Sequence, residues 1–236
     1  MKSKNQNLRY PKIIFEDQDI LLINKPSGLL SVPDGYNPDL PHIKSMLEPS
    51  YGPMWIVHRL DKESSGVMVL ARNEEAHRFL NESFRKRRIK KKYHGLVAPV
   101  PDWREKSLTH PLQIDADRQH RTRADRKSGK GAHSEFKVLK IFPFGVLMEI
   151  EIHTGITHQI RAHLRSEDLI LIGETLYNAG LPPLALTAPR MMLHARTLAF
   201  THPVTGKWQR FSAPYPEDFR DTYTKLRFAR DLDDVI

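Results

Sequence analysis

Eight short segments in which apolar and polar residues alternate constrain the fold of this 236-residue chain more than any other feature. A side-chain period of two residues is typical of a strand that has one face toward a core and the other toward water. Short turn sequences, such as Pro143-Phe144-Gly145 and residues 201–207, join several of these segments, which predicts antiparallel hairpins. The predicted strands cover residues 12–17, 20–24, 66–71, 93–98, 133–142, 145–153, 192–200 and 207–212.

Three helices are predicted beside these strands. The first spans residues 74 to about 87, because Asn73 can cap it and an apolar stripe follows at helical spacing. The second is expected to begin near Thr157, which can cap it, and the third follows Pro216. Runs of strands with few helices predict an α+β fold with a mixed, mostly antiparallel central sheet.

The length fits one large domain or two small ones, and the apolar share of 39% is enough for a core. We expect a single domain over residues 1–236, with a core from 13 to 215 and a C-terminal helix from 216 to 236. Cysteine is absent, which fits a reducing compartment. The first residues form no apolar signal region, and no stretch reaches the roughly 18 apolar residues of a membrane span. We therefore expect a soluble, cytoplasmic monomer with no membrane partner.

The charge balance favours a polyanionic partner. The chain has 37 Lys and Arg against 28 Asp and Glu, a formal net charge of +9. Seven cations fall within residues 85–92, and six more lie within 118–130. Tyr93 follows the first run directly, and an aromatic ring beside phosphate-binding cations is a combination that RNA-binding proteins use. A run this dense can also be a nuclear address or a solvated helix face.

Asp61 is the first candidate for chemistry. It follows the segment Trp55–Leu60, which ends in polar residues, and it precedes two serines, a glycine and an apolar run. An Asp between Arg59 and Lys62 is usually a turn residue or half of a surface ion pair. At the mouth of two buried segments, however, a carboxylate can be held rigidly and kept ionised by its basic neighbours.

Several other chemistries lack their motifs. The stretch around Asp61 echoes a kinase catalytic loop, but the chain has no Gly-rich loop and no D-F-G, and it has neither a P-loop nor G-x-S-x-G. His153, His158 and His163 are spaced by five residues, which does not place them on one helical face. The sequence therefore predicts no metal site. A glycosidase pair of Asp61 with Glu63, Glu149 or Glu151 stays open, although an exposed sheet face explains Glu149 and Glu151.

Five segments resemble the RluA family of pseudouridine synthases. The motif HRLDKESSG at 58–66 is similar to the family's H-R-L-D-x-x-T-S-G, and TGITHQIRAHL at 154–164 is similar to its T-G-R-x-H-Q-I-R-x-H-L. INKPSGLL, KKKYHGLVAP and RMMLHARTLAFTHPVTG resemble three further family elements, in the family's order, so that the resemblance spans residues 13–215. It implies the pseudouridine synthase fold, with a basic active-site cleft, and an isomerase that breaks the N1–C1′ bond of a uridine in RNA, rotates the uracil and rejoins it through C5. It implies no cofactor.

The resemblance also implies residue roles. Asp61 would be the catalytic carboxylate, Arg161 would pair with it, and Tyr93 would stack on the extruded uracil and help to remove the C5 proton. Further substrate contacts would come from His58, Arg59, Leu60, His158, Gln159 and Leu193. The RNA backbone would meet Arg85, Lys86, Arg87, Arg88, Lys90, Lys91, Lys92, Arg121 and Arg123.

Two positions depart from the family pattern. Ser64 replaces a threonine and keeps the hydroxyl, whereas Ile156 replaces an arginine and removes a cation. We expect either that a residue of 118–130 supplies that cation or that the substrate differs. The expected substrate is a stem-loop of rRNA or tRNA. The alternatives are an RNA-binding or ribosome-assembly factor with little or no catalysis, and an RNA glycosylase that releases free uracil.

Overall fold

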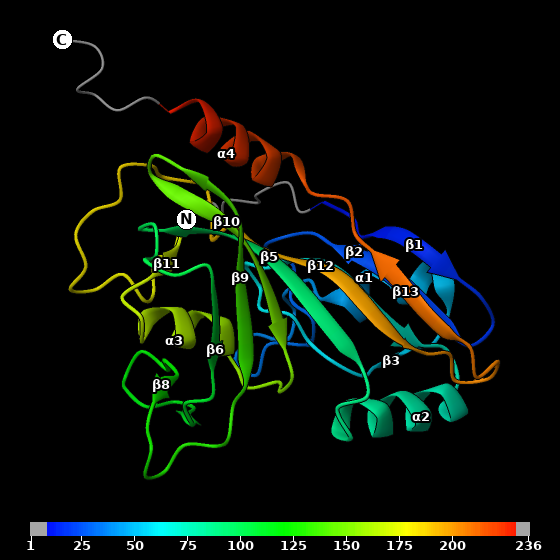
Figure 1. The fold of residues 1–236 in the computed structure, drawn as a ribbon. Helices are drawn as coiled ribbons and strands as arrows, with labels where there is room; N and C mark the ends of the chain where they lie inside the picture. Colours follow the sequence, from blue (N-terminus) through cyan, green and yellow to red (C-terminus); the bar gives the residue numbers. More distant parts are fainter. Residues whose placement is uncertain (1–8, 230–236) are drawn as a thin grey trace. The chain divides into compact units, whose positions relative to one another are not determined.

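The computed structural model describes residues 9–229, which form four helices and thirteen strands (Figure 1). These residues form two compact units, each built from two separate stretches of the chain. The first unit contains residues 9–90 and 195–214, and the second contains residues 91–194 and 215–229. The expected single domain stays a prediction, and residues 230–236 of the predicted C-terminal helix lie outside the described part.

Antiparallel strands build the sheet of the first unit. Strand β2 (Ile20–Lys25) pairs with β1 (Lys12–Glu16) on one side and with β4 (Ser65–Ala71) on the other. The short β3 (Trp55–Ile56) pairs with the end of β4, and β12 (Leu193–Thr201) is the next strand of the sheet beyond β4. Strand β13 (Trp208–Ser212) forms a hairpin with β12. All seven residues of β4 are buried, so this strand is covered on both faces.

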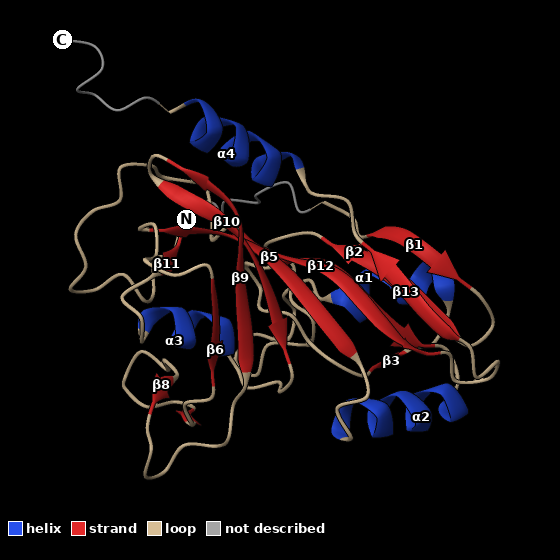
Figure 2. Ribbon diagram, in the orientation of Figure 1, coloured by secondary structure: helices blue, strands red, loops and turns tan. Residues whose placement is uncertain are grey.

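The first unit contains two helices (Figure 2), and only one of them was predicted from the sequence. Helix α2 (Glu74–Arg85) contacts β4, and the side chain of Asn73 caps it by accepting a hydrogen bond from the Ala76 amide at 2.8 Å. Helix α1 (Ile43–Tyr51) was not predicted, because it is only nine residues long and contains Pro49. A capping box between His42 and Ser45 begins α1, and Ile43 and Leu47 are its buried residues.

The second unit has its own antiparallel strands. Their order is β5 (Lys90–Ala98), β10 (Gly145–Ile152), β9 (Ser134–Phe142) and β6 (Glu105–Leu108), with β11 (Ile170–Leu171) paired to β5. A two-residue turn, Pro143-Phe144, joins β9 to β10, as predicted from the sequence. A separate two-stranded sheet, β7 (Leu112–Gln113) with β8 (Arg123–Ala124), lies in the basic stretch before β9.

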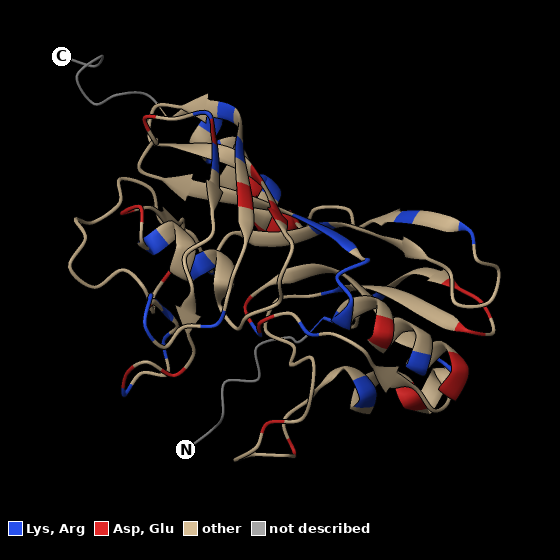
Figure 3. Cartoon of the chain, turned by 60° about the horizontal axis from the view of Figure 1, so that its bottom comes forward, with Lys and Arg blue, Asp and Glu red and all other residues tan. Residues whose placement is uncertain are grey.

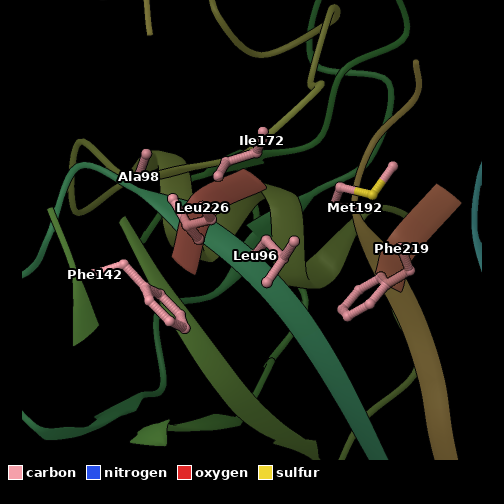
Figure 4. Close-up of a cluster of buried hydrophobic side chains, with 7 residues drawn as sticks. All are labelled: Leu96, Ala98, Phe142, Ile172, Met192, Phe219 and Leu226. Carbon is pink, nitrogen blue, oxygen red and sulfur yellow. The ribbon is translucent and has the colours of Figure 1, made fainter. Parts of the chain in front are cut away.

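A cluster of buried apolar side chains joins strands and helix α4 (Glu217–Phe228) in the second unit (Figure 4). Phe219 and Leu226 of α4 pack with Leu96 of β5 and Phe142 of β9. Tyr223 of the same helix also packs against the cluster, so one side of α4 faces it. The members of the cluster are Leu96, Ala98, Phe142, Ile172, Met192, Phe219 and Leu226.

The second helix begins near the predicted position, but its predicted cap was wrong. Helix α3 (Gln159–Arg165) begins two residues after Thr157, and its N-cap is His158 in a left-handed conformation (φ 56°) without a side-chain cap. The Ala162 amide donates to the His158 carbonyl at 2.9 Å, so the first helical hydrogen bond begins at His158, whereas the Thr157 carbonyl accepts from the Thr122 hydroxyl at 2.8 Å. The eight predicted strands are all present, with ends shifted by one to three residues.

Candidate functional site

Asp61 lies in a tight turn of the first unit, immediately before the buried strand β4. Its carbonyl accepts a hydrogen bond from the Ser64 amide at 3.0 Å, which closes the turn 61–64. The Asp61 side chain is half-buried, whereas Leu60 and Ser64 on either side are buried. The carboxylate is therefore anchored by its neighbours and still reaches the surface.

The segment 25–31 holds this turn in place. The Ser31 hydroxyl donates to the Leu60 carbonyl at 2.7 Å and accepts from the Leu60 amide at 3.1 Å. The Gly28 amide donates to the Lys62 carbonyl at 2.8 Å, and the Ser27 hydroxyl donates to the Glu63 carbonyl at 2.8 Å. Residues 60, 62 and 63 are thus each bonded to one segment, so the position of Asp61 is fixed from both sides.

Lys25 adds a buried charge to the same arrangement. It is 0% exposed, and its Nζ donates to the carbonyls of Leu29 at 2.7 Å, Pro26 at 2.9 Å and Lys62 at 3.2 Å. An ammonium buried among carbonyls is stabilised by these charge-assisted hydrogen bonds. The lysine of the N-terminal K-P-x-G element is therefore a structural support for the turn that carries Asp61. The sequence alone did not reveal this role, because the contacts join positions about 37 residues apart.

The position after the two serines requires a glycine, Gly66. Its φ is +124°, and a Cβ at this position would lie 2.3 Å from the Ala195 carbonyl oxygen. Any larger residue would push β4 away from the backbone of β12 and strain its own conformation. The turn of Asp61 therefore enters β4 through a position that admits only glycine.

The neighbours of Asp61 in the motif have different surroundings. The imidazole Nε2 of His58 accepts a hydrogen bond from the Val69 amide at 3.1 Å, and its ring stacks on Phe84 of α2 at 4.7 Å. Arg59 is exposed, and Leu60 is 4% exposed. His58 and Leu60 thus belong to the packing around the turn, and Arg59 is the member of the three that faces solvent.

Tyr93 and Leu193 lie in the second unit. Tyr93 is 8% exposed on β5, opposite Ile150 of β10, so it faces the other side of the sheet from its neighbour Lys92. Leu193 is 4% exposed at the beginning of β12. Both side chains are apolar surfaces held by regular strands.

Arg161 forms a buried ion pair that the sequence did not predict. Its Nε donates to Glu174 Oε2 at 2.7 Å and its second guanidinium nitrogen donates to Oε1 at 2.8 Å. Burial by itself would raise the pKa of Glu174, but the hydrogen bonds and charge of Arg161, together with the Leu176 and Tyr177 amides, hold that pKa below its usual range. The expected pairing of Arg161 with Asp61, which lies in the first unit, stays a prediction. Glu174 is the only charged residue of the stretch 169–177, which was the available sign of such a partner.

Tyr177 completes the surroundings of the Arg161 guanidinium. The guanidinium carbon lies 4.9 Å from the centre of the Tyr177 ring. The Tyr177 hydroxyl accepts from the Thr122 amide at 2.7 Å and lies 3.2 Å from Nδ1 of His158. These contacts hold the loop before α3 and the strand β8 together in the second unit.

Gln159 and Ile156 fix the loop that leads into α3. The Gln159 amide is 3% exposed; its oxygen accepts from the Thr154 hydroxyl at 2.8 Å and the Ile156 amide at 3.1 Å, and its nitrogen donates to the His133 carbonyl at 2.9 Å. Ile156 packs against an apolar cluster that includes Ala162 and Tyr177. The side chain that replaces the family's arginine is therefore part of a small apolar core.

The basic residues divide into paired and unpaired groups. Figure 3 shows Lys and Arg on helices, strands and loops, with acidic residues beside many of them. The predicted backbone contacts with an ion-pair or hydrogen-bond partner are Arg85 and Lys86 (both to Glu82), Lys91 (to the Thr154 carbonyl), Lys92 (to Glu149) and Arg121 and Arg123 (both to Asp117). Arg87, Arg88 and Lys90 are exposed, and none of them has a side-chain partner in the described part of the chain.

Comparison with known proteins gives one consistent family. Residues 19–166 match the family model described as RNA pseudouridylate synthase. The chain is 33% identical to the dual-specificity RNA pseudouridine synthase RluA of Escherichia coli K12, over 86% of this chain and 92% of that protein. It is also 34% identical to the ribosomal large subunit pseudouridine synthase D of Xanthomonas campestris, over 91% of this chain and 69% of the relative.

Two solved structures are similar in fold. Human RNA Pseudouridylate Synthase Domain Containing 4 superposes with a TM-score of 0.76 at 26% identity, over 92% of this chain and 93% of the other. Human RNA Pseudouridylate Synthase Domain Containing 1 has the same TM-score of 0.76 at 20% identity, over 100% of this chain and 96% of the other. The predicted fold class is confirmed. Within residues 9–229, no helix combines the length and the apolar character that a membrane crossing requires.

Proposed function

Because the chain belongs to the RNA pseudouridylate synthase family, we propose that it isomerises one specific uridine in rRNA or tRNA and that Asp61 is its catalytic carboxylate. Members of this family convert uridine to pseudouridine in RNA, so the chain is an isomerase. The observation that carries the assignment of Asp61 is its position in a turn whose residues 60, 62 and 63 are each bonded to the segment 25–31. A catalytic group held in this way reaches the reacting atoms without first losing conformational freedom.

In the proposed reaction, the N1–C1′ bond breaks, the uracil rotates, a C5–C1′ bond forms, and the proton at C5 moves to solvent or to a basic group while N1 gains a proton. Asp61 acts either as a nucleophile at C1′ or C6 or as a base at C2′. Tyr93 stacks on the uracil and helps to remove the C5 proton. Arg161 supplies a positive charge, and Glu174 holds its guanidinium plane in one orientation.

The target uridine has to leave its stack to be rearranged. Extrusion of a base costs a few kcal/mol, which stacking on Tyr93 and phosphate contacts offset. Arg87, Arg88 and Lys90 are the best candidates for phosphate contacts in the first basic run, because they are exposed and have no acidic partner in the described structure. Of the two predicted contacts in the second run, Arg123 is the better candidate, because 54% of its side chain is exposed against 17% of that of Arg121, and both pair with Asp117.

The substrate class is proposed from the relatives. One is named for dual specificity and another for the large ribosomal subunit, which supports a stem-loop of tRNA or rRNA as the target. We expect the enzyme to act as a cytoplasmic monomer. Arg123 also supports the idea that the second basic run replaces the cation missing at Ile156, because Thr122 beside it is bonded to the Thr157 carbonyl at 2.8 Å.

An RNA-binding factor without catalysis is the second candidate. This candidate was supported by Ile156, which stands where the family pattern has an arginine. The packing of Ile156 in an apolar cluster gives that residue a structural role, so it does not argue for lost catalysis. The combination of Asp61, Tyr93 and Arg161 favours the enzyme, because simple RNA binding requires none of these three together.

The decisive experiment is tritium release from tRNA and rRNA labelled at uridine C5, with Asp61→Asn as the comparison. We expect release and pseudouridine formation by the wild type, none by the variant, and RNA affinities within about tenfold of each other, which is about 1.4 kcal/mol. Turnover by Asp61→Asn at the wild-type rate would overturn the assignment of Asp61. Free uracil in place of pseudouridine would identify a glycosylase, and RNA binding without release would favour the binding factor.

A further inference from the structure

Three potential metal ligands meet at one end of the β9–β10 hairpin. His133 precedes β9, Glu135 lies on β9, and His153 follows β10; one ligand atom of each lies within 4.8 Å of the others. Ile152 pairs with Ser134, so His153 is opposite His133, and Glu135 lies two residues along the same face. We propose that His133, Glu135 and His153 form a binding site for a divalent transition-metal ion of the zinc type.

An unsatisfied nitrogen is the first argument. Nε2 of His153 is buried and makes no hydrogen bond within the described structure. It lies 3.0 Å from Glu135 Oε1, but the geometry is not that of a hydrogen bond. Buried polar atoms almost always have a partner, and an exception requires an explanation such as an ion. A metal ion bound to this nitrogen provides that partner.

The distances between the ligand atoms are the second argument. Glu135 Oε1 lies 3.0 Å from His153 Nε2 and 3.6 Å from His133 Nε2. Around a tetrahedral zinc ion with bonds of about 2.0–2.1 Å, neighbouring ligand atoms are about 3.3 Å apart. The two observed separations lie on either side of this value. The third separation, between the ligand nitrogens of the two histidines, is at most 4.8 Å. The two rings stack with centroids 4.3 Å apart, so at least one imidazole has to rotate out of the stack for both nitrogens to point at one ion.

The charges on the sheet are the third argument. Glu135 lies directly opposite Glu151 in the β9–β10 ladder, and two like charges in such a pair destabilise a sheet. Lys92 lies 3.6 Å from Glu151 and compensates that carboxylate. The ion-pair partners of Glu135 are His133 and His153, which are charged only when protonated. A bound dication would neutralise Glu135 at neutral pH.

A second cluster of similar composition lacks these properties. Asp17, Asp19 and His202 also bring ligand atoms together, but each already has a partner. Asp17 accepts from the Ile20 amide at 2.8 Å and lies 2.9 Å from His202 Nε2, and Asp19 accepts from Asn73 at 2.8 Å. These contacts explain the second cluster as a structural network, so no ion is proposed there.

The site is accessible and its ligands select among metals. Glu135 lines a groove of about 490 Å³ in the second unit, and both histidines are more than one third exposed. Two imidazole nitrogens and one carboxylate oxygen suit Zn²⁺ better than Mg²⁺, which prefers oxygen ligands. The Ser107 hydroxyl lies 3.1 Å from His133 Nε2, but this exposed group can rotate away.

The test is calorimetric titration of the tag-free full chain with Zn²⁺ alone. We expect saturable binding of one ion, weakened at least about tenfold in both His153→Gln and Glu135→Gln. Ser107→Ala, beside the site, and His120→Gln, an exposed histidine elsewhere, should bind as the wild type does. Absence of saturable binding, or unchanged binding in both ligand variants, would overturn the proposal.

A second measurement separates loss of the site from loss of folding. The circular dichroism of the metal-free variants should match that of the wild type, because the ligands are at the surface end of a hairpin. Zn²⁺ should raise the Tm of the wild type and not that of His153→Gln, whereas Mg²⁺ should leave both unchanged. An equal rise in both proteins would place the ion elsewhere and contradict the assignment. Activity toward RNA is not part of either readout, so the result is independent of the proposed function.

Discussion

The guanidinium of Arg161 and the carboxylate of Glu174 face each other in a bidentate pair, with 9% and 2% of their side chains exposed. A buried pair of this kind fixes both partners in one orientation, since neither can turn without leaving a charge unpaired. The pair therefore ties helix α3 to the segment after β11, and it presents the remaining guanidinium edge in a constant direction.

Glu174→Gln should destabilise the protein by about 3 kcal/mol, because it leaves the buried Arg161 charge uncompensated. Urea unfolding of the wild type and the variant measures this difference. Asp168→Asn is the matched control, since it removes the carboxylate partner of Arg165 in an exposed pair. If both variants lost the same stability, the buried pair would have no special role.

The stability that Glu174 contributes should depend on pH in a defined direction. Its pKa is held below the ordinary value of 4.5, so the contribution is complete above about pH 4.5 and is lost as the pH falls through the folded-state pKa. The difference in free energy of unfolding between the wild type and Glu174→Gln should therefore shrink between pH 5 and pH 3. Urea titrations at several pH values measure it, and a difference that stays constant over this range would contradict the ion-pair account.

Lys25→Met should remove the three hydrogen bonds that the ammonium donates and leave their carbonyls unsatisfied. We expect a loss of about 3 kcal/mol in the free energy of unfolding, measured in urea. In protein that still folds, single turnover should slow while RNA affinity changes little, because the turn of Asp61 loses its support. Lys12→Met, on the exposed side of β1, is the control. Wild-type turnover in a folded Lys25→Met variant would show that this support is dispensable.

Gly66→Ala should destabilise the first unit by at least about 2 kcal/mol, because the new methyl group would overlap the Ala195 carbonyl and the residue would keep a positive φ. Thermal and urea unfolding measure the loss. Gly35→Ala is the control, since no atom lies within 4 Å of the Cβ that it would add. Similar stabilities for the two variants would mean that β4 and β12 can separate without penalty.

Replacement of Arg87, Arg88 and Lys90 by Ala should reduce the slope of log affinity against log salt concentration by about 2, since about 0.7 to 0.9 counterion is released per phosphate contact. Filter binding at several salt concentrations measures the slope. Arg85 and Lys86 share one carboxylate partner, so their double replacement should have a smaller effect. An unchanged slope in the triple variant would rule out this part of the run as a phosphate contact.

The sequence predicted those strands and helices whose formation depends on residues close together in the chain. Alternation located all eight principal strands, and the Asn73 cap and apolar stripe located α2 to within two residues at its end. Helix α1 was missed because nine residues with an internal proline carry little periodic signal. The predicted cap of α3 was wrong, because the cap position is His158 in a left-handed conformation, which the sequence pattern does not indicate.

Only those residues of the candidate site that belong to a sequence motif could be predicted. Asp61 and Arg161 stand in recognisable sequences, but the support from Lys25 and the pairing with Glu174 join residues that are distant in the chain. The cluster of His133, Glu135 and His153 was missed for the same reason. Spacing along one segment cannot reveal ligands that a strand pairing brings together.

Each unit is built from two distant stretches of the chain, which limits how far it can fold during translation. When a ribosome has made the chain as far as residue 194, the first unit still lacks most of β12 and all of β13, and the second unit lacks helix α4 with Phe219 and Leu226. The apolar faces that these elements cover are then open to the surrounding solution. Neither unit can complete its core before residue 194, so residues 195–214 must emerge before the first unit becomes resistant to proteases, and helix α4 before the second does.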